Sequence, residues 1–175
     1  MSRPKKCVVD TNVPITANKA LRPDKLDDEL IPCVLACIKA IEHVVKHGGP
    51  VLDAGDEIYN EYRHQLSLKG TPGLGDSFMK WVHDNRWSSR VERVPITPSG
   101  DSYEEFPDHP GLRSFDRSDR KFVAVACAHP EKPVVLQATD SKWWGWKDAL
   151  AEAGVAVQFL CPDYVEATWE KKLGA

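Results

Sequence analysis

Four carboxylates stand where predicted strands end or predicted helices run, and carboxylates in such positions can hold metal ions. They are Asp10, Glu61, Asp119 and Asp140. Asp10 and Asp140 each follow an apolar run typical of a buried strand, and sites in open parallel sheets gather outside the carboxyl ends of the strands. Carboxylate oxygens are the ligands that suit Mg²⁺ and Mn²⁺. If the fold gathers all four acids, the sequence predicts a site for a hard divalent cation.

Two of the four acids have a rival close by in the chain. Glu57 lies one helical turn before Glu61, and Asp116 lies three residues before Asp119. Asp119 opens a predicted buried helix, which favours it over Asp116. Position alone leaves both choices open.

Predicted strands and helices alternate along the chain, which is the pattern of an α/β fold with a parallel sheet flanked by helices. The predicted strands are Val8–Val9, Val51–Leu52, Val91–Ile96, Val134–Ala138 and Val155–Leu160. The predicted helices are Leu30–Lys46, Asp56–Leu68, Asp76–Asn85, Asp119–Ala128 with Ser118 as N-cap, Lys147–Ala153 and Tyr164–Lys172. We expect the chain to turn after Asp10, through Thr11–Pro14, and to form a loop over Thr97–Gly111, which is rich in Pro, Gly and Ser.

Length and composition indicate one globular domain. The 175 residues suffice for a proper core, and 42% hydrophobic with 28% charged residues is ordinary for a soluble protein. We expect no membrane segment, because no apolar stretch approaches the length of a span. The first residues lack the apolar core of a secretory signal, so we expect a cytoplasmic protein. A net charge of −3 decides little about partners.

Five cysteines form no CxxC pair, and with no export signal we expect reduced, mostly buried thiols. Cys33 and Cys37 lie one helical turn apart, a spacing that could serve a metal. Structural zinc sites usually show tighter paired ligands, so core cysteines are the favoured interpretation.

The ordered set of acidic motifs resembles the PIN-domain nucleases. The motifs are Val8-Val9-Asp10-Thr11-Asn12-Val13, the Glu61-Tyr62 helix, Ser118-Asp119-Arg120-Lys121-Phe122 before an alanine-rich helix, and Ala138-Thr139-Asp140 after a strand. The resemblance runs from Cys7 to Leu160. It implies an α/β/α sandwich around a central parallel sheet, formed by one PIN-like domain over residues 1–175 with a longer region around 67–113. It also implies metal-ligand roles for the four acids, favours Glu61 through its Glu-Tyr pair, and makes Asn12 an accessory residue together with Asp116 and Glu57.

The function that this resemblance implies is metal-dependent endoribonuclease activity. One or two Mg²⁺ or Mn²⁺ ions would activate a water for attack on a phosphodiester, most plausibly in single-stranded RNA. The resemblance also makes a homodimer and an antitoxin or defence-system partner reasonable expectations. Side chains near the acids could contact the nucleic acid, namely Arg63, Arg120, Lys121, Lys142 and Trp143.

Two other functions fit parts of the sequence. Asp10-Thr11-Asn12 is similar to the DxDxT nucleophile loop of haloacid-dehalogenase-type phosphatases, but Asn12 stands in place of the second Asp, which is the general acid. The other alternative is a catalytically silent PIN fold that binds RNA or a partner protein. Degenerate sites usually lose acidic residues, and this chain keeps all four.

Overall fold

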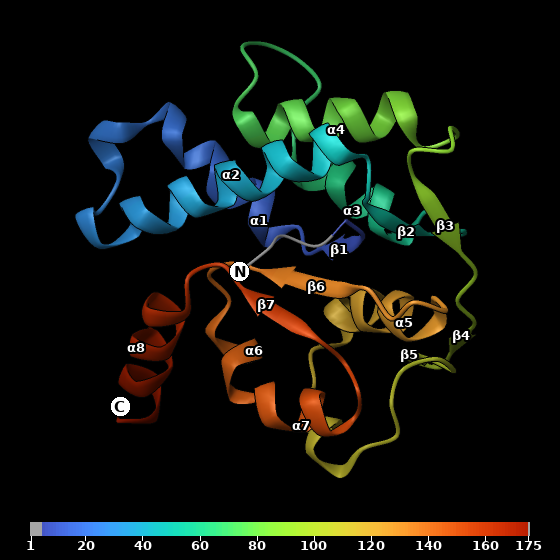
Figure 1. The fold of residues 1–175 in the computed structure, drawn as a ribbon. Coiled ribbons are helices and arrows are strands. Elements are labelled where there is room, and N and C mark those ends of the chain that lie inside the picture. The colour runs from blue at the N-terminus through green and yellow to red at the C-terminus, as the bar shows by residue number, and fades with distance from the viewer. Residues whose placement is uncertain (1–4, 175) are drawn as a thin grey trace.

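The computed structural model describes residues 5–174 and shows a mixed α/β fold with a small parallel sheet (Figure 1). Strand β6 (Val134–Gln137) lies between β1 (Cys7–Val9) and β7 (Val157–Phe159), and both pairings are parallel. Val8 pairs with Val135, and Val135 pairs in turn with Val157. The carboxyl ends of these strands therefore meet at one edge of the sheet.

A second parallel pair extends this arrangement beyond β1. Strand β2 (Val51–Asp53) pairs with β3 (Glu92–Val94), and a bridge between Cys7 and Pro50 places β2 beside β1. Because β6 already occupies one edge of β1, β2 lies along the other. The predicted loop over Thr97–Gly111 contains a short antiparallel hairpin of β4 (Pro98–Ser99) and β5 (Ser102–Tyr103).

Helices pack around the strands in two groups (Figure 1). The first group, α1 (Asn12–Asn18), α2 (Ile31–His47) and α4 (Leu74–Asn85), packs together, and α3 (Glu57–Gln65) follows β2. The second comprises α5 (Arg120–Ala128), which packs on β1, β2 and β6, and α6 (Ser141–Gly145), α7 (Lys147–Glu152) and α8 (Pro162–Leu173). Short 3-10 turns cover residues 19–21, 23–25, 28–30, 110–112 and 117–119.

The predicted helices and strands are found at their expected places within a few residues, with three differences. Helix α1 occupies the segment predicted as a turn, because Pro14 falls in the first turn, where backbone N–H groups have no helical partner. Helix α6 was not predicted. Ser118 is not an N-cap, since it lies inside the 3-10 turn Arg117–Asp119, and α5 begins after Asp119.

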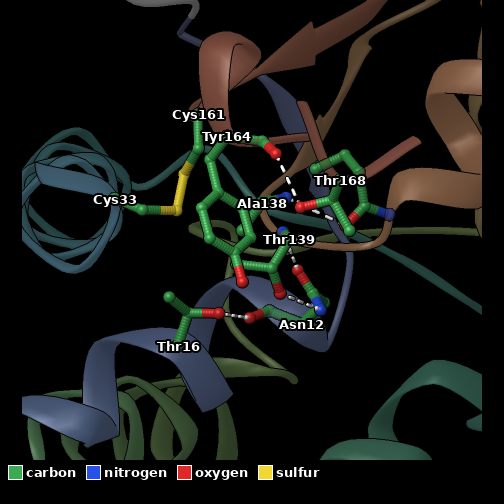
Figure 2. The surroundings of a disulfide bond; sticks show 9 residues. Asn12, Thr16, Cys33, Ala138, Thr139, Cys161, Tyr164 and Thr168 are labelled. Carbon is green, nitrogen blue, oxygen red and sulfur yellow. Dashed lines mark hydrogen bonds between the residues drawn. A yellow bond between two sulfur atoms is a disulfide. The ribbon is translucent and has the colours of Figure 1, made fainter. Parts of the chain in front are cut away.

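A disulfide joins Cys33 on α2 to Cys161 at the start of α8 (Figure 2). The two Cα atoms are 5.2 Å apart although 128 residues separate them in sequence. The prediction of reduced thiols is therefore wrong for this pair. Spacing along the chain carries no signal of the pairing, because only the return of the chain from β7 into α8 brings Cys161 beside α2. Cys7, Cys37 and Cys127 are free thiols.

The core is a continuous apolar cluster between the strands and both groups of helices. Its largest fully buried side chains include Trp143, Tyr62, Phe78, Phe115 and Phe122. Over residues 5–174, no helix has the length and apolar character needed to cross a membrane.

A close approach of α1 and α4 depends on Gly75. A Cβ atom added to Gly75 would lie 1.9 Å from the carbonyl oxygen of Pro14, which is backbone and cannot move aside. We expect Gly75→Ala to lower the free energy of unfolding by about 1–3 kcal/mol, the usual cost of overpacking, as measured by urea denaturation. Gly174→Ala is the control, because its added Cβ meets only atoms at 3.5 Å or more. Equal stability of both variants would contradict this account of the contact.

Candidate metal centre

Asn12 joins the chain after β1 to the chain after β6. Its side-chain amide donates to Oγ1 of Thr139 at 2.8 Å, and its side-chain oxygen accepts the Thr139 N–H at 2.6 Å. The ladder itself continues one residue past β1, since the Asp10 N–H donates to the carbonyl oxygen of Leu136. These bonds fix the relative position of Asp10 and Asp140, which flank the joined segments.

Only one of the two oxygens of the buried Asp10 carboxylate accepts a hydrogen bond within residues 5–174. It is 5% exposed, and its Oδ1 accepts the Asn12 N–H at 2.9 Å. Its Oδ2 is also buried and has no hydrogen-bond partner among residues 5–174. Burial raises the pKa of Asp10 well above its usual range, and the charges of Asp119, Glu61 and Asp140 raise it further. A cation at Oδ2 would offset both the cost of burying the charged carboxylate and its repulsion from the neighbouring acids.

Asp119 lies in a cluster with Asp116 and Asp140. One carboxylate oxygen from each lies within 4.8 Å of the others. Burial raises the pKa of Asp119 to about 6, against the lowering effect of a hydrogen bond from Nε1 of Trp143 at 3.1 Å. The charges of Asp140, Glu61 and Asp116 add to this rise. Asp140 also accepts the Lys142 N–H at 3.0 Å and so caps α6.

Glu61 reaches the same region from α3. The hydroxyl of Tyr62, the next residue, donates to the carbonyl oxygen of Val9 and anchors α3 at the end of β1. Glu61 itself accepts a hydrogen bond from Oγ1 of Thr11 and forms an ion pair with Nζ of Lys121 at 3.0 Å. Because the charge of Glu61 acts on both Asp10 and Asp119, all four predicted acids lie in one electrostatic neighbourhood.

The two rival acids are placed differently. Glu57 is exposed in the first turn of α3, and its charge acts on Tyr103 rather than on the acid cluster. Asp116 belongs to the cluster, where its Oδ2 forms an ion pair with Nζ of Lys142 at 2.9 Å. The geometry favours Glu61 over Glu57, and it keeps Asp116 beside Asp119 as a further oxygen donor.

Most of the predicted nucleic-acid contacts are engaged inside the protein. Arg120 donates to the backbone carbonyls of Arg113 and Phe115, and Lys121 is buried against Glu61. Trp143 is fully buried and uses its ring N–H on Asp119, so no face of the ring is open to an unpaired base. Burial corrects the assignments of Lys121 and Trp143, whereas Arg120 is half-buried and its assignment stays a prediction.

The two other predicted contacts are accessible. Arg63 is exposed on α3, and Lys142 is exposed although it pairs with Asp116. Thr11, Thr139 and the Trp143 ring N–H are contributors to the site that were not recognised in the sequence. Thr11 and Thr139 adjoin predicted acids, which is the one signal that could have indicated them. The burial of Trp143 against Asp119 has no local signal.

The arrangement offers the ligand type that hard divalent cations prefer. Carboxylate oxygens of Asp116, Asp119 and Asp140 lie within 4.8 Å of one another, and the charges of these acids and Glu61 act on Asp10 or Asp119. The unpartnered Oδ2 of Asp10 and the raised pKa of Asp119 are both features that a bound cation would relieve. Two ammonium groups already act on these acids, Lys142 on Asp116 and Lys121 on Glu61. Comparison with known proteins finds no relative, because no family model, curated protein or solved structure matches the chain.

The crowded acids give a pH dependence that can be measured in EDTA. A carboxyl group whose pKa is higher in the folded than in the unfolded protein destabilises the fold as it ionises. For Asp119 the destabilisation is absent below pH 3.8 and complete above about 6. We therefore expect Asp119→Asn to be more stable than wild type by up to about 3 kcal/mol at pH 7.5, at 1.36 kcal/mol per pKa unit.

This stability difference should vanish near pH 3.5. The measurement is urea denaturation of both proteins across this pH range, with Asp108→Asn, an exposed acid away from the cluster, as control. An unchanged or negative difference at pH 7.5 would show that Asp119 is held by favourable contacts instead.

Proposed function

We propose that this protein is a metal-dependent nuclease with a PIN-like fold. The observation that carries the proposal is the buried, unpartnered Oδ2 of Asp10 amid the charges of Glu61, Asp119 and Asp140. The parallel order β3-β2-β1-β6-β7 supports a PIN-like sandwich, with β2 joined to β1 through the Cys7–Pro50 bridge. So does the packing of helices around these strands.

The side chains of the centre divide the work of holding a cation. Asp119 and Asp140 would supply oxygen ligands together with Asp116, and Asp10 would add its unpartnered Oδ2. The ion pair with Lys121 holds Glu61 in place and neutralises its charge, so Glu61 repels the other carboxylates less. A bound Mg²⁺ or Mn²⁺ would lower the pKa of a coordinated water and stabilise charge on the phosphoryl oxygens. Asn12 positions the site, because the nitrogen and the oxygen of its side-chain amide both form hydrogen bonds with Thr139.

The surface around the exposed Trp87 ring supports a nucleic-acid substrate. The side chains of Arg86 and Arg93 beside it are 20% and 17% exposed and pair with Asp56. The guanidinium of Arg86 lies 3.8 Å from the ring centre of Tyr59 on α3, and that of Arg93 lies 3.9 Å from the ring centre of Trp87. Trp87 is 70% exposed. Indole rings and guanidinium planes stack with unpaired bases, and arginines also bind phosphates. With the exposed Arg63 on α3, this surface favours single-stranded RNA as the substrate class.

The nuclease proposal predicts strict metal dependence. We expect endonucleolytic cleavage of an unstructured RNA oligonucleotide with Mg²⁺ or Mn²⁺, and none in EDTA. Asp10→Asn and Asp140→Asn should each reduce cleavage by about a hundredfold or more, because each removes an oxygen ligand; even outer-shell changes cost 10–100-fold. The assay is gel analysis of an end-labelled oligonucleotide with purified variants of matched folding.

Asp108→Asn serves as the control for charge removal and should cleave like wild type. Cleavage that persists in EDTA, or that survives Asp10→Asn, would reject the metal mechanism.

Phosphatase chemistry makes a contrasting prediction. A dehalogenase-type enzyme would use Asp10 as a nucleophile and needs a general acid two residues later. Asn12 cannot supply a proton in that way, and both ends of its amide contact Thr139. We expect little or no hydrolysis of p-nitrophenyl phosphate, no trapping of Asp10 by fluoroberyllate, and RNA fragments with 5′-phosphate ends. A phosphorylated Asp10 detected by mass spectrometry would favour the phosphatase instead.

A further inference from the structure

Three cysteine sulfur atoms lie close together between α2 and the start of α8. Cys33 and Cys37 lie one turn apart on α2, and Cys161 is the residue before α8. Their sulfurs all lie within 4.8 Å of one another. The residues are 3%, 0% and 6% exposed, respectively. The disulfide uses two of them and leaves the Cys37 thiol beside it.

A surface cavity of about 460 Å³ opens next to this cluster. Cys33 and Cys161 both line it, and the side chains of Glu29, Asp163 and Tyr164 lie on its walls. Figure 2 shows Tyr164 beside the disulfide, with α2 on one side of the bond and the start of α8 on the other. One side of the cluster is therefore packed in the core, while the other faces a space large enough for an added ligand.

We propose that Cys33, Cys37 and Cys161, once reduced, bind a thiophilic cation of the Zn²⁺ class through three thiolates, with the fourth position facing the cavity. Tetrahedral zinc has metal–sulfur distances of about 2.3 Å, which place the sulfurs about 3.8 Å apart. That separation falls within the 4.8 Å that already encloses the three sulfurs. The Cα separation of 5.2 Å between Cys33 and Cys161 lets their sulfurs part to this distance by side-chain rotation.

The chemical steps balance with a cellular dithiol as reductant. The dithiol gives two electrons and two protons to the Cys33–Cys161 bond, which becomes two thiols while the dithiol closes to its own disulfide. Binding the cation then displaces one proton from each of three thiols. Three thiolates and one divalent cation leave a net charge of −1, which the positive N-terminal end of α8 and the charge of Lys19 acting near Cys37 oppose.

A bound cation would give Cys37 a function as a thiolate ligand, beyond its place in the core. Burial raises the pKa of this thiol to about 12, so it stays protonated at neutral pH without a cation. A buried metal binds thiolates and reverses that preference. The disulfide and the cation would be alternative links between α2 and α8. Helix α8 in turn contacts α6 through a hydrogen bond from Nζ of Lys172 to Oγ of Ser141 at 2.7 Å.

The test is a Cd²⁺ titration of the full chain, because cadmium bound to thiolates absorbs in the near ultraviolet. The protein is reduced with a phosphine, which does not compete as a thiol, and desalted without oxygen. We expect one Cd²⁺ per chain and an absorption typical of three thiolates. Cys37→Ser should lose about one third of the absorption and weaken binding by more than about tenfold, while Cys127→Ser should leave both unchanged. The oxidised wild type should give no absorption at this site.

Alkylation of the wild-type chain provides a second readout that needs no variant. Zn²⁺ should protect Cys33 and Cys161, which line the cavity, from N-ethylmaleimide in the reduced protein, and Cys127 should react with or without Zn²⁺, as mapped by mass spectrometry. Asp10→Asn should leave the Cd²⁺ absorption unchanged, which separates this site from the acidic centre. The proposal is overturned if the reduced protein gives no thiolate absorption, or if Zn²⁺ fails to protect Cys33 and Cys161.

Discussion

The burial of the Asp10 carboxylate among like charges is the constraint on which the rest of the site depends. An unsatisfied buried polar atom costs about 1–3 kcal/mol, and more for a charged group, so the surrounding structure must hold Asp10 in place against that cost. It does so through the backbone. The Asp10 N–H continues the ladder to Leu136, and the Asn12 N–H takes up the other carboxylate oxygen. The remaining carboxylate oxygen, Oδ2, has no hydrogen-bond partner among residues 5–174 and lies near other acidic side chains. An oxygen in such surroundings has the properties of a cation ligand.

The position of β1 explains how acids from distant segments come near enough for their charges to act on Asp10. Strand β1 has β6 on one edge and β2 on the other, so the chain after β6 and the helix after β2 both begin beside Asp10. Two side-chain bonds lock these neighbours. Asn12 holds Thr139, and the Tyr62 hydroxyl holds the Val9 carbonyl oxygen, so the acids are supported by hydrogen bonds to the strands and not only by their own helices.

The structure also separates two groups of side chains with different ligand atoms within one chain. Oxygen ligands gather at the carboxyl ends of the strands, where hard cations are favoured, while three sulfurs gather between α2 and α8, where soft cations are favoured. The basic side chains beside the acids neutralise those acids, and Lys121 and Lys142 are the two examples.

The sequence by itself determined most of the local elements, and it predicted an acidic centre. Apolar runs ending in Asp10 and Asp140 predicted two strand ends, and helical spacing predicted α2 and α5 to within a few residues, because both signals are local. Position along the helix could not choose between Glu57 and Glu61, which lie one turn apart, and only the family resemblance favoured Glu61. Nor could the sequence reveal the burial of Trp143 against Asp119 or the bond between Cys33 and Cys161. Those contacts join residues far apart in the chain, and only the order of the strands and the return of α8 bring them together.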